Sequence, residues 1–164
     1  MGRTFVAVGL WLAMAGNGVS AESAKDALEV FGLVGTWSAD CSKDLTKEAG
    51  SRKIYDVPAV GAPGFSEIIR LNTGVTSKFK GEIQEATRIT EDKIRLIYKG
   101  SEITFSNGAK PGASEFDPVQ TILEKVGQKV RVLDWRHADG SQTLIENGMI
   151  SAKYPVLLIE KCLD

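Results

Sequence analysis

The sequence predicts an all-β protein, an antiparallel up-and-down barrel with a short N-terminal helix. Eight or nine short runs of β-branched and aromatic residues follow one another, separated by glycine, proline, asparagine and aspartate. Of the only two cysteines, Cys41 ends the first of these runs and Cys162 directly follows the last. A bond between them would join the first strand to the last, as a sheet closed on itself requires.

Residues 1–21 have the pattern of a secretory signal peptide. Arg3 supplies the charged start, an eleven-residue apolar run follows from Phe5 to Ala15, and Val19-Ser20-Ala21 forms a small-residue cleavage site. The apolar run is too short to cross a bilayer of about 30 Å at about 1.5 Å per residue, so we expect no integral membrane span after processing. The expected mature chain is one soluble barrel domain over residues 22–164, in the periplasm or secreted.

The charge balance of the mature chain is close to neutral. The leader holds one of the 20 basic residues and none of the 21 acidic ones, which leaves 19 basic against 21 acidic. Without a basic block, nucleic acid is not expected as a partner. An oxidising compartment favours a structural disulfide between Cys41 and Cys162.

One helix is expected, from Ser23 to Leu33. Ser23 can cap it, Asp26 stands in the first turn where a carboxylate is favoured, and Gly32 ends it. Its apolar side could plug one end of the barrel or pack across an edge.

The strands are predicted from alternation and turn residues. We expect nine of them, at Val34–Cys41, Lys53–Val60, Phe65–Leu71, Lys78–Ile89, Lys93–Lys99, Val119–Val126, Lys129–Arg136, Gln142–Ile150 and Tyr154–Lys161, and Glu102–Phe105 as a short further strand. Gly100 is expected to break its run, and Gly81 raises the question of a bulge.

Ile94, Leu96 and Tyr98 alternate with polar or outward positions and are expected to face inward, where they would line a ligand cavity. The segment Asn107–Pro118 is predicted as a long loop. It is either a lid or partner contact, or a solvated connection.

Trp135 can be placed in two ways. If Val130 and Val132 face the core, alternation points Trp135 outward; if the other face is inward, Arg131 is buried or at the rim beside it. Alternation does not decide between these. The only histidine, His137, falls at a predicted turn and is expected to be exposed.

The Gly35-x-Trp37 pair at the start of the first strand resembles the lipocalin and wider calycin signature. That resemblance implies a lipocalin-like barrel in which Trp37 packs across one end beside a short helix. The tail, with Arg136-His137-Ala138-Asp139-Gly140 and Leu158-Ile159-Glu160-Lys161-Cys162, resembles the ending of small exported proteobacterial proteins of unassigned function. This second likeness supports the compartment, the barrel and the disulfide.

Recognisable catalytic and metal-binding patterns are missing from the sequence. There is no nucleophile elbow, phosphate-cradling glycine loop, dinucleotide fingerprint or His/Cys ligand spacing. We therefore expect no enzyme, cofactor or metal. The leading hypothesis is a barrel that binds a small, mainly apolar ligand. The alternatives are an envelope protein-binding module, such as an enzyme inhibitor, and a structural envelope protein.

Overall fold

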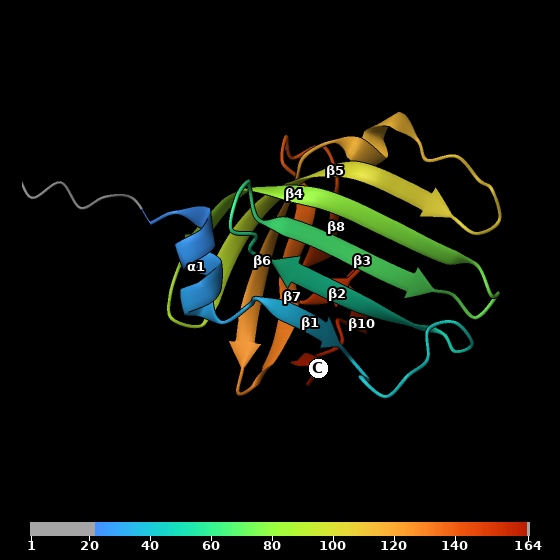
Figure 1. Cartoon of the computed structure of the whole chain (residues 1–164), viewed down its shortest axis with the longest axis horizontal. Helices are drawn as coiled ribbons and strands as arrows, with labels where there is room; N and C mark the ends of the chain where they lie inside the picture. Colours follow the sequence, from blue (N-terminus) through green and yellow to red (C-terminus); the bar gives the residue numbers. More distant parts are fainter. Residues whose placement is uncertain (1–21, 164) are drawn as a thin grey trace, which may run out of the picture.

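The computed structural model describes residues 22–163 and shows a closed antiparallel β-barrel with a helix at one end (Figure 1). The predicted signal peptide, residues 1–21, lies outside the described residues. In the described part of the chain eight strands close the barrel: β1 (Gly35–Ser38), β2 (Gly50–Asp56), β3 (Gly64–Arg70), β4 (Thr76–Arg88), β5 (Lys93–Phe105), β6 (Val119–Val126), β7 (Lys129–His137) and β11 (Ile159–Lys161). The predicted fold class is confirmed.

The barrel closes through its shortest strand. β11 pairs with β7 through Ile159 and Val130, and with β1 through Lys161 and Trp37. The Cys41–Cys162 disulfide is present, with Cα atoms 5.4 Å apart and a sequence separation of 121. The Cys162 backbone N–H also donates to the Thr36 carbonyl at 2.8 Å. A three-residue strand makes few ladder bonds, so the disulfide reinforces this seam.

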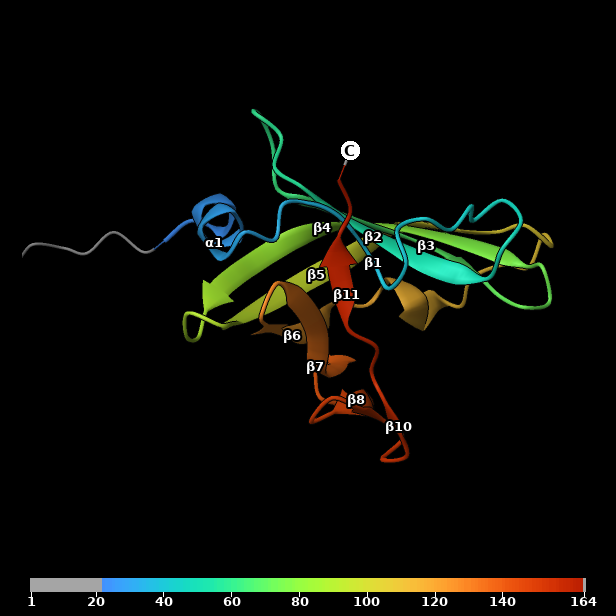
Figure 2. The same ribbon diagram turned by 90° about the horizontal axis from the view of Figure 1, so that it is seen from below.

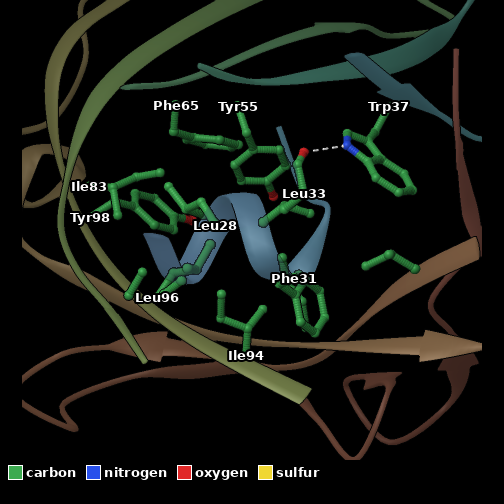
Figure 3. Packing of buried hydrophobic residues seen from close by; sticks show 14 of the residues in the cluster. Leu28, Phe31, Leu33, Trp37, Tyr55, Phe65, Ile83, Ile94, Leu96 and Tyr98 are labelled. Carbon is green, nitrogen blue, oxygen red and sulfur yellow. Dashed lines mark hydrogen bonds between the residues drawn. The ribbon is translucent and has the colours of Figure 1, made fainter. Parts of the chain in front are cut away.

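The helix α1 (Ala24–Phe31) plugs one end of the barrel. The Asp26 N–H donates to the Ser23 hydroxyl oxygen at 3.1 Å, and Gly32 ends the helix at φ 75°, as the sequence predicts. Leu28 and Phe31 are buried among core residues of β4 and β5 (Figure 3). Of the two alternatives for this helix, the plug is the one observed.

Two glycines in the central hairpin were singled out from sequence, and one of them acts differently from expectation. Gly100 does not break its run, because β5 continues through it to Phe105. A Cβ at Gly100 would come within 3.0 Å of the Phe79 ring, so glycine here makes room for that ring. Gly81 does stand at a bulge: the register shifts between Lys80 and Gly81, and Ser101 of β5 is the extra residue opposite them.

The C-terminal strands also differ from the prediction. The run predicted as one strand over Gln142–Ile150 is a hairpin of β8 (Thr143–Glu146) and β9 (Met149–Ile150), turned by Asn147 and Gly148 at φ 51° and 73°. The last predicted strand is split into β10 (Tyr154–Pro155) and β11. We call residues 143–155 the arm, because β8 and β10 project from the barrel body (Figure 2).

Candidate functional site

A cavity of about 630 Å³ occupies the end of the barrel opposite α1. Its walls come from strands β2 to β7, from the arm, and from the short 3-10 helix η1 (Ala113–Phe116). Twelve of the 21 lining residues are aromatic or aliphatic, and the other nine are polar or charged. This size and this mixture are typical of small-molecule sites.

The cavity exists because the strands have unequal lengths. β4 and β5 have 13 residues each, whereas β6 follows β5 only as far as the pair of Tyr98 with Val119. On the other side, β11 pairs with β7 only at Val130 and Lys129. The far halves of β4 and β5 therefore extend past the neighbours that close the barrel, and the arm and η1 border the space that remains.

An aromatic layer crosses the barrel between this cavity and the core around α1. It consists of Tyr55, Phe65, Phe79 and Tyr98, one from each of the strands β2 to β5. Neighbouring ring centroids lie 4.9 to 6.0 Å apart in tilted or edge-on arrangements. Phe65, Phe79 and Tyr98 border the cavity, so this layer is its floor.

A bulge in β7 turns Trp135 and His137 into the cavity. The register with β6 shifts between Ile122, opposite Asp134, and Leu123, opposite Val132, which leaves Leu133 as the extra residue. Val132 and Trp135 can then both face inward, although alternation would place them on opposite faces. Both alternatives for Trp135 assumed a regular strand, and neither is what the structure shows.

His137 is half-buried in the cavity wall, so the expectation of an exposed turn residue is wrong. β7 includes this residue, and its backbone N–H donates to the Gln142 carbonyl at 2.9 Å. Its ring lies edge-on to Trp135, with centroids 6.2 Å apart.

An ion pair lies on the inner wall. The Lys53 ammonium is 2.5 Å from a Glu67 carboxylate oxygen, and the two side chains keep only 19% and 17% of their exposure. The two residues are direct partners in the β2–β3 ladder. Lys53 also lies 5.5 Å from the centre of the Phe65 ring.

Both tyrosines of the floor stay protonated at neutral pH. Burial raises the pKa of Tyr98, while the hydrogen bond from Trp135 acts in the opposite direction, and the charge of Glu67 raises it further. Burial likewise raises the pKa of Tyr55, with Tyr98 and Glu67 adding to the effect. The Trp135 indole N–H donates to the Tyr98 hydroxyl oxygen at 2.7 Å, which leaves the hydroxyl hydrogen for a second bond.

The residues proposed from sequence fall in different parts of the barrel. Tyr98 borders the cavity, whereas Ile94 and Leu96 are fully buried in the core and are absent from the cavity wall. Trp37 is also buried, and its indole N–H donates to the Leu33 carbonyl at 2.7 Å (Figure 3). Gly35 has φ 123°, and a Cβ there would meet Lys161 at 2.7 Å.

The ion pair was missed from sequence, although a signal for it existed. Lys53 stands two residues before Tyr55, and Glu67 two residues after Phe65. Because side chains alternate along a strand, both charges share the inward face with those aromatic residues. Their direct pairing depends on the strand register, which the sequence pattern does not reveal.

The loop Asn107–Pro118 contributes to the mouth of the cavity. Ser114 and Glu115 of η1 lie in its wall. Because Gly100 has no side chain, the backbone of η1 can lie close to β5: a Cβ at Gly100 would be 3.3 Å from the Glu115 carbonyl oxygen.

Neither a metal site nor a membrane-spanning helix is found in the part of the chain that the structure describes. Within residues 22–163 no three His, Cys, Asp or Glu side chains gather closely enough to hold an ion. Over the same residues no helix has the length and apolar character needed to cross a bilayer.

Comparison with known proteins gives no relative: no family model, curated protein or solved structure matches this chain. The closed eight-stranded barrel formed by the described residues is compatible with a calycin-like fold.

Proposed function

We propose that this protein is an exported, non-catalytic β-barrel that binds one small, mainly apolar ligand in the cavity opposite α1. The observation that carries the proposal is the cavity itself, about 630 Å³ in volume with an aromatic floor. A void lined by Phe65, Phe79 and Trp135 favours apolar occupants, because such surface gains free energy when it leaves water.

Export is supported by two features. The leader pattern of residues 1–21 predicts secretion, and the Cys41–Cys162 disulfide is a bond that oxidising compartments maintain. A mass spectrum of the protein recovered without reductant from the exported fraction tests this. The expected mass corresponds to a chain that starts at Glu22 and lacks two hydrogens; a chain that keeps Met1 to Ala21 would contradict it.

Ligand binding is tested by titration with 1-aminoanthracene, a neutral apolar probe whose emission rises in an apolar site. Ser77 is a small residue in the cavity wall, so Ser77→Phe should fill part of the void and weaken binding about tenfold or more. The matched control is Lys80→Phe, three residues further along β4 on the exposed face, which should bind like the wild type. Equal affinity in both variants would contradict the proposed site.

A second candidate function is a protein-binding module of the cell envelope. Exposed apolar side chains near the arm favour it, since Tyr154 and Leu157 keep 67% and 71% of their exposure. The double variant Tyr154→Ser, Leu157→Ser should then abolish capture of a partner from envelope extracts while leaving probe binding unchanged. Unchanged capture would reject this surface.

A further inference from the structure

The ion pair Lys53–Glu67 is an unusual feature for the interior of a barrel. Charged side chains are seldom buried unless they are paired, and a buried pair often contributes little to stability. Here both members lie in the wall of the cavity, next to the aromatic floor. Their position suggests a role in contacting the ligand.

The charges around the cavity balance. The pair Lys53 and Glu67 contributes one charge of each sign to the half-buried part of the wall, and the other two charged residues, Lys78 and Glu115, are exposed and of opposite sign to each other. A net charge on the ligand would therefore meet no excess of opposite charge. A carboxylate near Lys53 would also face Glu67, and an ammonium near Glu67 would also face Lys53, because the two groups are 2.5 Å apart.

The pair instead offers hydrogen bonds of both kinds. An ammonium has three N–H donors, and a carboxylate has two acceptor oxygens, so a single contact between them leaves further capacity on each. A neutral group with an acceptor for Lys53 and a donor for Glu67 satisfies both sides without burying a new charge.

We infer that the ligand has a neutral polar head with both a hydrogen-bond donor and an acceptor, of which a primary amide is the simplest example. This head lies against Lys53 and Glu67, and the apolar body lies over the aromatic floor. The inference rests on the ligand-binding function proposed above and adds the chemical class of the ligand to it.

The test compares three unbranched probes of eight carbon atoms each that differ in the head: octanamide, octanoate and octylamine. Calorimetric titration of the mature protein at pH 7 should give the tightest binding for octanamide. We expect octanoate and octylamine to bind about tenfold more weakly, because each buries a charge without an excess of opposite charge.

Two variants sharpen the test by unbalancing the pair. Glu67→Gln leaves Lys53 as an unopposed cation and should change the preference to octanoate. Lys53→Met leaves Glu67 unopposed and should change the preference to octylamine. Glu102→Gln is the matched control, because it removes the carboxylate of the exposed pair Lys80–Glu102, which keeps 65% and 55% of its exposure. This control should keep the wild-type order of affinities.

The outcomes separate the two proposals. If none of the three probes binds the wild type, the ligand-binding function fails, and this inference with it. If the wild type binds octanoate or octylamine as tightly as octanamide, the neutral-head inference is overturned while ligand binding stands. The wild-type order of affinities decides this even if a variant does not fold.

Discussion

At the helix end of the barrel, Leu28, Phe31 and Leu33 fill the space between the strands, together with Ile94 and Leu96. At the open end the same strands enclose a cavity and present Lys53 and Glu67 to it. The two ends share β4 and β5, and the aromatic layer separates them. One end is packed and the other is hollow because different elements contact β4 and β5 at the two ends.

The comparison shows how a small barrel can combine a stable core with an empty site. At the helix end, α1 supplies apolar side chains that complete the packing. At the open end, β6 and β11 stop short and the β7 bulge redirects Trp135. Because core packing at the helix end stabilises the fold, the open end does not need to be filled and can bind a ligand.

The largest predicted effect comes from removing the disulfide, which reinforces the pairing of the first strand, β1, with the last strand, β11. The double variant Cys41→Ala, Cys162→Ala should lower the free energy of unfolding by about 4 to 5 kcal/mol on the chain-entropy relation. Urea denaturation of the oxidised wild type and the variant measures it. A loss below about 1 kcal/mol would show that β11 closes the barrel without the disulfide.

The next prediction contrasts the two ends directly. Leu28→Ala removes a fully buried side chain from the helix end and should cost about 3 kcal/mol. Ile103→Ala removes a half-buried side chain from the cavity wall and should cost about 1 kcal/mol. Equal losses in urea denaturation would show that the open end is packed as tightly as the helix end.

A smaller effect is expected from the ion pair. Lys53→Met leaves the Glu67 charge without its partner and should destabilise the fold by about 2 kcal/mol. Adding Glu67→Leu should recover most of this loss, because both charges are then absent from the wall. The exposed control Lys80→Met should change stability by no more than about 0.5 kcal/mol. A double variant less stable than Lys53→Met would contradict this reasoning.

The smallest prediction concerns the helix cap. Ser23→Ala removes the hydroxyl that accepts from the Asp26 N–H and should cost about 1 kcal/mol. Because α1 plugs the opposite end, the affinity for 1-aminoanthracene should stay unchanged. A weakened affinity in this variant would mean that the two ends are coupled.

Much of the fold could be predicted from local patterns. Ser23 and Gly32 mark the ends of the helix, and Val119–Val126 is a strand with the predicted bounds, because capping, glycine and alternation are local signals. The Cys41–Cys162 disulfide followed from the cysteine count and the expected compartment.

The residues that line the cavity were harder to predict from local sequence patterns. Trp135 faces inward because of the bulge at Leu133, and a bulge changes the phase of the alternation without a clear sequence signal. The Lys53–Glu67 pair depends on strand register. By contrast, the Asn147-Gly148 turn could have been predicted, since this dipeptide is a strong hairpin signal, but the prediction placed it inside one strand over Gln142–Ile150.

The most direct test of the account is a methyl NMR titration, because isoleucines occur at both ends. Ile69, Ile103, Ile145 and Ile150 line the cavity, whereas Ile83 and Ile94 belong to the core around α1. Addition of 1-aminoanthracene to the mature protein should shift the δ1-methyl signals of the first group and leave those of Ile83 and Ile94 in place. Shifts of equal size at Ile83 and Ile94, or none at the four cavity residues, would contradict the claim that the open end is the ligand site.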